Sequence, residues 1–229
     1  MFLLYVRYAV ALISIVGLAF ILFNPAYVGP VSALMFVIAS LLWFRRTVVE
    51  FGWGSVRGQL TGILGLAFVV QAIGCGLVNA NGGIHIPDRS VLLFLIARLL
   101  FFTASARYTF HFLRKWHVLP PGKVRAALGA TLLVVLVVAV IPGTLPRLFR
   151  PSVYTLFVLA DVLLLLSSFY NLFLFWGTMV MKRWVFGTAV VVLLTVGDAF
   201  LMGGLGEMTT MLTWYMAASF IALTGTIRT

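Results

Sequence analysis

The sequence predicts an all-α polytopic membrane protein, a bundle of about eight transmembrane helices, and three observations lead to this fold class. Hydrophobic residues make up 63% of the 229 residues and charged residues only 9%, whereas a soluble domain carries about 25% charged residues. The mean hydropathy is +1.15. Apolar segments of about 20 residues, the length that crosses a bilayer as a helix, follow one another along nearly the whole chain. We therefore expect a single integral membrane domain over residues 1–229.

Eight apolar segments mark the expected spans. They cover residues 3–23, 27–44, 59–79, 91–112, 126–142, 152–178, 184–203 and 208–226. Turn-forming residues separate most of them, namely Asn24-Pro25, Gly52 to Gly54, Asn79 to Pro87, Pro120-Pro121-Gly122, Pro142-Gly143 and Gly203-Gly204. The weakest break lies between Gly203 and Glu207. Without that break the last two segments form one long bent helix, and the number of spans falls to seven.

The positively charged residues orient the predicted bundle, because short loops rich in Lys and Arg stay on the cytoplasmic side of a membrane. Twelve of the 16 Lys and Arg residues fall on the side of the C-terminus. Arg89, Arg147 and Arg150 fall on the opposite side, and Arg98 lies within a span. The net charge of +11 therefore reports orientation and not a nucleic-acid partner. We expect both termini in the cytoplasm and the protein in a prokaryotic cytoplasmic membrane.

Several chemistries are excluded by what the spans lack. A retinal Schiff base requires a lysine inside a span, and no lysine lies inside one here. His85, His111 and His117 fall near the predicted membrane surfaces, so they do not form a bis-histidine haem site. The single cysteine, Cys75, excludes a disulfide and a multi-cysteine metal site. No phosphate-binding loop, zinc-protease motif or nucleophile elbow occurs. We expect no cofactor, no metal ion and no catalytic residue.

Four polar residues on four different spans are predicted to share one layer in the outer half of the membrane. At 1.5 Å per residue, Gln71, Arg98 and Asp161 lie roughly 12 to 13 Å below the outer ends of their spans, and Asp198 roughly 8 Å below. A charge inside a span costs roughly 2.5 to 3.5 kcal/mol or more, so such residues face the bundle interior and are functional candidates. We expect the four to form one cluster that binds a ligand.

An arginine can bind a carboxylate through two parallel hydrogen bonds, so Arg98 is predicted to pair with Asp161 or Asp198. The other carboxyl group is then protonated, shared, or exposed to a water-filled cavity that opens outward, as a transport site requires. In such a site Arg98 would hold an anionic group or a carboxylate, and the aspartates would act as counter-ion and as proton or cation acceptor. Gln71 would contribute a hydrogen bond. The structural alternative is a buried ion pair that only fixes how the helices pack.

The two aspartates also suggest a hydrolase. Asp161 and Gly197-Asp198 resemble the paired aspartates of presenilin-type intramembrane proteases, and Gly197-Asp198-Ala199 is similar to the Gly-Asp motif of lysoplasmalogenase-type membrane hydrolases. The resemblance implies two carboxyl groups that act as acid and base on a water molecule. It covers only a few residues: Thr195 stands where the presenilin-type motif has its first glycine, Ala160 replaces the tyrosine before the first acid, and the last span lacks a Pro-Ala-Leu motif.

The predicted cytoplasmic face has its own candidates. Four basic residues between the fourth and fifth spans are candidates for binding anionic lipid headgroups, at about 1 kcal/mol each: Arg114, Lys115, Lys123 and Arg125. The alternative is that they only orient the protein. Four tryptophans near the same face are predicted to belong to the aromatic belt: Trp43, Trp53, Trp116 and Trp184. Polar residues elsewhere in the spans are expected to be helix-packing groups: Ser105, Ser167, Ser168 and Asn171.

The function predicted from these residues is the binding or transport of a small solute or ion at a polar site in the outer leaflet. The expected partners are the lipid bilayer, the solute or ion, and other membrane subunits. Two alternatives stay open, a non-enzymatic accessory or scaffold subunit of a membrane complex and a two-aspartate intramembrane hydrolase. The lack of a complete catalytic motif favours a protein that is not an enzyme.

Overall fold

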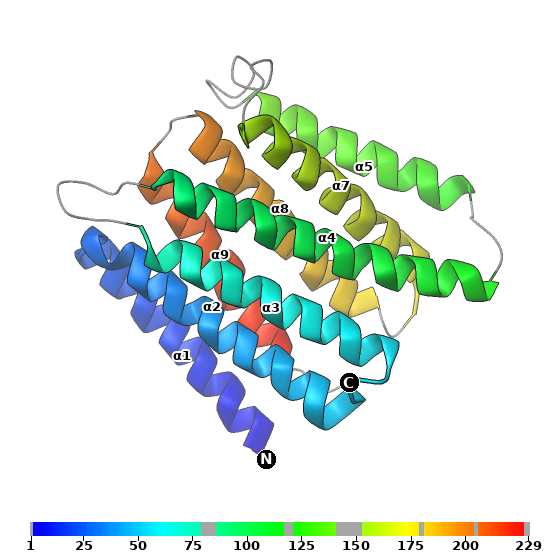
Figure 1. Cartoon of the computed structure of the whole chain (residues 1–229), viewed down its shortest axis with the longest axis horizontal. Coiled ribbons are helices and arrows are strands. Elements are labelled where there is room, and N and C mark those ends of the chain that lie inside the picture. Colours follow the sequence, from blue (N-terminus) through cyan, green and yellow to red (C-terminus); the bar gives the residue numbers. More distant parts are fainter. Residues whose placement is uncertain are drawn as a thin grey trace.

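The computed structural model describes residues 2–78, 86–116, 121–140, 153–178, 181–203 and 206–226. Within these ranges the chain is helical apart from short turns, and no β-strand occurs. The long helices, which run side by side in Figure 1, are α1 (Phe2–Phe23), α2 (Val28–Arg45), α3 (Val56–Gly76), α4 (Asp88–Trp116), α5 (Pro121–Ala139), α7 (Val153–Leu174), α8 (Met181–Gly203) and α9 (Glu207–Gly225). A 3-10 turn, η1 (Pro25–Tyr27), precedes α2, and a π-helical turn, η2 (Arg46–Phe51), extends it.

Each predicted span corresponds to one of these long helices, so the chain is an integral membrane protein with an all-α fold. Seven helices in the described part, all of them except α9, are long and apolar enough to cross a membrane. The last helix, α9, has 19 residues and ten buried ones. A helix inside the bundle contacts protein and not lipid, so it does not need an apolar surface all round. The weak break before Glu207 is a true chain reversal, because α8 and α9 pack against each other as a hairpin (Figure 1).

Two helices extend beyond the predicted spans that end near residue 112 and begin near residue 126. The fourth helix continues to Trp116, and α5 begins at Pro121. Proline is favoured in the first turn of a helix because its missing N–H would have no partner there. The candidate headgroup residues therefore lie on the ends of two helices. His85, His117, Arg147 and Arg150 lie outside the described residues.

Six of the helices form a closed ring. In order around it, α2, α3, α4, α7, α8 and α9 each pack against the next, and α9 packs against α2 to close the circle. The ring thus consists of two sets of three consecutive helices. Because successive helices alternate in direction, the two sets run through the bundle with the same sequence of directions (Figure 1).

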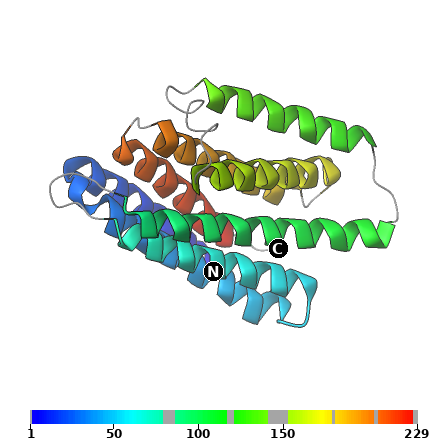
Figure 2. The same ribbon diagram turned by 45° about the horizontal axis from the view of Figure 1, so that its top comes forward.

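The helices α1 and α5 lie outside the ring. The first packs mainly on α9 and the second mainly on α7, and in Figure 2 α5 lies at one side of the bundle. Only 11% of the apolar window of α1 and 17% of that of α5 are buried, against 56% for α3. Leu133 and Val137 on α5 are both more than half exposed. Such continuous apolar faces are typical of helices that contact lipid.

Candidate functional site

The ring encloses a buried charge cluster, formed by Gln71, Arg98, Asp161, Asp198 and Trp214. These side chains come from α3, α4, α7, α8 and α9, and none is more than 2% exposed. The structure therefore brings together the four polar residues that sequence analysis placed in one layer. Trp214 is an addition to that set.

Asp198 is the acceptor on which the charge cluster converges. Arg98 donates to it twice, from Nε to Oδ2 at 2.8 Å and from Nη2 to Oδ1 at 2.9 Å. The indole Nε1 of Trp214 donates to the same Oδ1 at 2.9 Å. Arg98 also donates from Nη1 to Oε1 of Gln71 at 3.0 Å. This two-pronged arginine–carboxylate pair is the strongest geometry available to such groups, so Arg98 and Asp198 tie α4 to α8 across the ring.

Two glycines allow aromatic rings to cover the charge cluster. The rings of Phe94 and Trp214 meet edge to face with their centroids 4.3 Å apart. A Cβ on Gly197 would lie 2.7 Å from the indole of Trp214, and one on Gly74 would lie 2.4 Å from the ring of Phe94. The absence of a side chain at these two positions therefore lets the rings approach the helices closely and exclude water from the ion pair.

Asp161 is held differently from Asp198. Its Oδ1 lies 3.5 Å from Nε of Arg98, within ion-pair distance but beyond a good hydrogen bond. Neither carboxyl oxygen of Asp161 has a hydrogen-bond partner among the described residues. Asp161 also borders a cavity of about 40 Å³ between α5, α7 and α8, and Thr195, whose Oγ1 likewise lacks a partner there, borders the same cavity.

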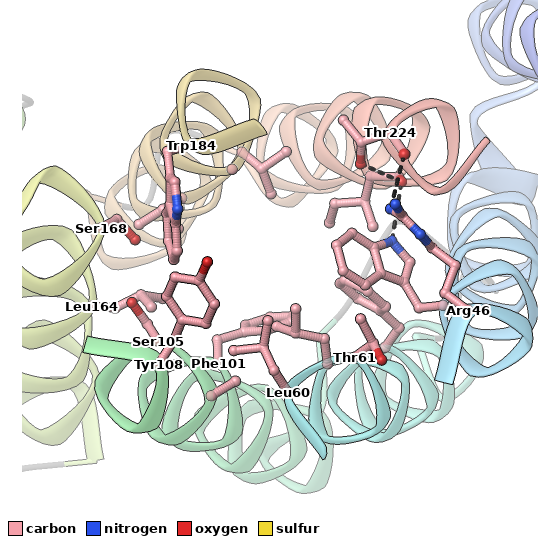
Figure 3. Close-up of a pocket in the computed structure, with 18 of the residues that line it drawn as sticks. Arg46, Leu60, Thr61, Phe101, Ser105, Tyr108, Leu164, Ser168, Trp184 and Thr224 are labelled. Atoms are coloured by element: carbon pink, nitrogen blue, oxygen red, sulfur yellow. Dashed lines mark hydrogen bonds between the residues drawn. The ribbon is translucent and has the colours of Figure 1, made fainter. Parts of the chain in front are cut away.

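A larger axial cavity occupies the other half of the ring. Its volume is about 170 Å³, and all six ring helices contribute to its wall, as Figure 3 shows in a view with the helices around the opening. Much of the wall is aromatic, with Trp43, Phe68, Phe101, Tyr108 and Trp184 among its residues. The Tyr108 hydroxyl points into the space (Figure 3). The cavity can therefore contact both an apolar body and a small number of polar groups.

The axial cavity reaches the basic end of the bundle, by which we mean the end that holds η2 and the first turns of α3 and α8. Its charged wall residues are both arginines, Arg46 and Arg57. Arg46 is buried and donates to Oε2 of Glu50 at 3.2 Å and to the carbonyl oxygen of Thr224 at 3.4 Å. Arg57 is exposed in the first turn of α3. Arg57 thus places a positive charge at the exposed mouth of the cavity.

The axial cavity ends one helical turn from the charge cluster. Four of its wall residues lie three or four positions from cluster residues on the same helices, about 5 Å along each axis: Phe68 from Gln71, Phe101 from Arg98, Leu164 from Asp161 and Leu194 from Asp198. In each helix the wall residue is on the side of the basic end. The ring is therefore hollow from the basic end to this layer and is filled by the charge cluster immediately beyond it.

No protein-family model matches the chain, and no curated protein or solved structure is significantly similar to it. The residues of the site therefore carry the functional argument alone. Among the described residues, no group of three or more His, Cys, Asp or Glu side chains is arranged to hold a metal ion.

The axial cavity was not among the features predicted from the sequence. Trp43 and Trp184 were predicted to lie in the aromatic belt, but both line the cavity, and Trp43 donates from Nε1 to the carbonyl oxygen of Ile221 at 3.3 Å. That prediction was wrong because position near a membrane surface does not tell which side of the helix faces lipid. Trp53 is more than half exposed, and the side chain of Trp116 lies outside the described part.

The predicted packing groups are confirmed as contacts between helices. Ser167 donates to Oγ of Ser105 at 2.9 Å, and Asn171 donates to the same Oγ at 3.1 Å, so α7 is hydrogen-bonded to α4. The carbonyl oxygen of Ser168 accepts from Thr188 at 3.3 Å. Ser105 and Ser168 also line the axial cavity. These residues hold the ring together and at the same time supply part of the cavity's polar surface.

The headgroup candidates lie at the basic end and stay a prediction. Arg114 and Arg125 are exposed and Lys123 is half-buried, while the side chain of Lys115 lies outside the described part. A neighbouring basic side chain, Arg107, donates to Oε1 of Gln59 and links α4 to α3.

Proposed function

We propose that the protein binds a small organic anion in its axial cavity and carries it across the membrane along the axis of the helix ring. The observation that carries this proposal is the position of the cavity. It reaches the basic end and stops one turn short of a closed, charged layer to which five of the same six helices contribute. A path that is open on one side of a central seal is what an alternating-access carrier has in each of its end states.

The size of the axial cavity fits a solute that consists of about one substituted aromatic ring. Its 170 Å³ is close to that of an engineered apolar cavity of about 150 Å³ that binds benzene. Rings such as those of Phe101 and Trp184 provide the apolar contact, and the hydroxyl of Tyr108 provides a polar one.

The charge of the residues around the axial cavity supports the proposal that the solute is an anion. The charged wall residues of the cavity, Arg46 and Arg57, are both positive. Arg46 forms an ion pair with Glu50 at 3.2 Å, and Arg45 shares that same carboxylate at 3.3 Å. Clefts lined by one sign of charge concentrate ligands of the opposite sign. Arg57 lies at the exposed mouth and is the residue to which we assign the anionic group of the solute.

Cysteine labelling tests whether water reaches the axial cavity. In a Cys75→Ala background, Ala104→Cys places a thiol in the cavity wall, Ala97→Cys places one two turns away on α4 beside the charge cluster, and Leu133→Cys places one on the lipid face of α5. We expect a membrane-impermeant maleimide to label Ala104→Cys from the basic end and to leave the other two unlabelled. Failure to label Ala104→Cys from either side of the membrane would refute an open cavity.

Binding and uptake of benzenesulfonate test the proposed solute class, because this probe is a small aromatic anion that does not cross membranes unaided. We expect it to raise the unfolding temperature of the purified protein and to enter proteoliposomes. Benzenesulfonamide, its uncharged analogue, should have less effect on stability, and Arg57→Gln should weaken the effect of the anion. Equal effects of both compounds would contradict the charge argument.

The two other hypotheses predict different results. A two-aspartate hydrolase needs a water molecule between its acids, yet both oxygens of Asp198 accept hydrogen bonds from Arg98, so this arrangement supports an ion pair. An accessory subunit would show neither labelling of Ala104→Cys nor uptake, and it would purify with other membrane proteins at a fixed ratio.

A further inference from the structure

The charge cluster contains more acid than base. One guanidinium, that of Arg98, faces two carboxyl groups, at 2.8 Å for Asp198 and 3.5 Å for Asp161. If all three groups were ionised, a surplus negative charge would be held where none of the three is more than 2% exposed. An unbalanced buried charge costs several kcal/mol. The cluster therefore requires one more positive charge.

Of the two carboxyl groups, Asp161 is the one whose ionisation would produce the surplus negative charge. Asp198 accepts three hydrogen bonds, two from Arg98 and one from Trp214, and each of them stabilises its ionised form. Neither oxygen of Asp161 has a hydrogen-bond partner among the described residues. Asp161 is therefore stabilised less than Asp198 in its ionised form, and it is the group that takes up the missing positive charge.

The surroundings of Asp161 fit a proton better than a metal cation. The seventh helix packs against α4, α5 and α8. From α4 Asp161 faces Arg98, and from α8 it faces Asp198 and the neutral Thr195. The side chains that α5 contributes to the adjoining cavity are Val135, Val138 and Ala139, which are apolar, and Lys123 and Arg125 lie ten or more residues away along that helix, about 15 Å.

Hard cations such as Ca²⁺ take six or more oxygen ligands, and Mg²⁺ also needs six. Of the residues that border the cavity beside Asp161, Thr195 is the one other that carries a side-chain oxygen. A proton requires no such shell of ligands. It also converts Asp161 into an O–H donor beside the carboxylate of Asp198.

We propose that Asp161 is a proton-binding site that controls the closure of the ring. With the proton bound, Asp161 is neutral and Arg98 keeps both of its carboxylate hydrogen bonds on Asp198, as in the geometry seen here. When the proton leaves to water, the ionised Asp161 competes with Asp198 for the same guanidinium and loosens the link between α4 and α8. Coupling of this exchange to solute movement rests on the proposed function, whereas the proton site itself does not.

Infrared spectroscopy of the full chain in lipid nanodiscs tests the proton site without any solute. A protonated carboxylic acid has a carbonyl stretch at higher frequency than a carboxylate, and we expect such a band in the wild type near neutral pH, with loss of intensity as the pH is raised. Asp161→Asn should lose this band. Asp88→Asn, an exposed acid at the start of α4, should keep it. Retention of the band in Asp161→Asn, or its absence from the wild type, would overturn the proposal.

Thermal unfolding in detergent provides a second test, because asparagine imitates a neutral aspartic acid. We expect Asp161→Asn to keep the unfolding temperature of the wild type to within a few degrees, and Asp198→Asn to lower it much further. Equal losses in the two variants would mean that Asp161 is ionised and would overturn the proposal. An unfolding temperature that rises with sodium ions in the wild type but not in Asp161→Asn would assign the site to a metal cation instead.

Discussion

The two halves of the helix ring are built from the same six helices but are filled in opposite ways. In one half, the side chains of the charge cluster fill the ring, and none of them is more than 2% exposed. In the other, the same helices leave a cavity of about 170 Å³ with a largely apolar wall. Polar groups in a membrane must find partners inside the protein, so they draw helices together. Apolar rings have no such requirement, so they can surround an open space.

The largest expected difference between the halves comes from the ion pair. Arg98→Ala leaves Asp198 buried without its two strongest hydrogen bonds, and breaking such a pair costs about 3–5 kcal/mol. The free energy of unfolding in mixed micelles, followed by circular dichroism, measures this loss. Arg114→Ala, which removes an exposed arginine of the same helix, is the control and should change stability little. Equal, small effects of the two variants would show that the charge cluster does not stabilise the fold.

A matched pair of tryptophans compares one hydrogen bond in each half. Trp214→Phe removes the donor at 2.9 Å to the ionised Asp198, and a hydrogen bond to a charged group contributes about 1.5–3 kcal/mol. Trp43→Phe removes the donor at 3.3 Å to a backbone carbonyl oxygen, where about 0.5–1.5 kcal/mol is expected. Unfolding of the two variants under the same conditions gives the ranking. A larger loss of stability for Trp43→Phe would contradict the interpretation that the half with the charge cluster is held by the stronger hydrogen bonds.

A matched pair of alanines on α4 compares the packing of the two halves. Ala97 and Ala104 are both fully buried and lie two turns apart, but only Ala104 lines the axial cavity. Ala97→Leu should lower stability by about 1–3 kcal/mol because the packed layer has no room. Ala104→Leu should cost less, because its side chain can enter the cavity, and it should weaken binding of benzenesulfonate. Similar stability losses in both variants would indicate that the cavity does not accept side chains.

The smallest expected effect compares two helical glycines. A Cβ at Gly197 would meet the indole of Trp214 at 2.7 Å, whereas one at Gly129 on α5 would meet nothing within 4 Å. Gly129→Ala should stabilise the protein by about 0.5–1 kcal/mol, since alanine is the better helix former. Gly197→Ala should destabilise it by displacing Trp214 from Asp198. The same sign for both changes, measured by unfolding temperature, would show that the indole can move at no cost.

The polar layer was predictable from sequence because depth in a membrane can be counted along a helix. Four residues at similar depth on four spans had to meet inside the bundle, and Gln71, Arg98, Asp161 and Asp198 do so. Which aspartate pairs with Arg98 was not predictable. That choice depends on the rotation of α7 and α8 about their axes and on Trp214, which supplies a further donor to Asp198.

By itself, the sequence determined that this protein is a bundle of membrane-spanning helices and that its buried charges lie at one depth. Both properties depend on local quantities, the length and polarity of each segment, which the bilayer converts directly into spans and depths. Only the tertiary structure decided that six of the helices close into a ring, that α1 and α5 stand outside it, and that the ring is sealed at one level and hollow at the next. Those features depend on which face each helix turns to its neighbours, and that is settled by contacts between residues far apart in the chain.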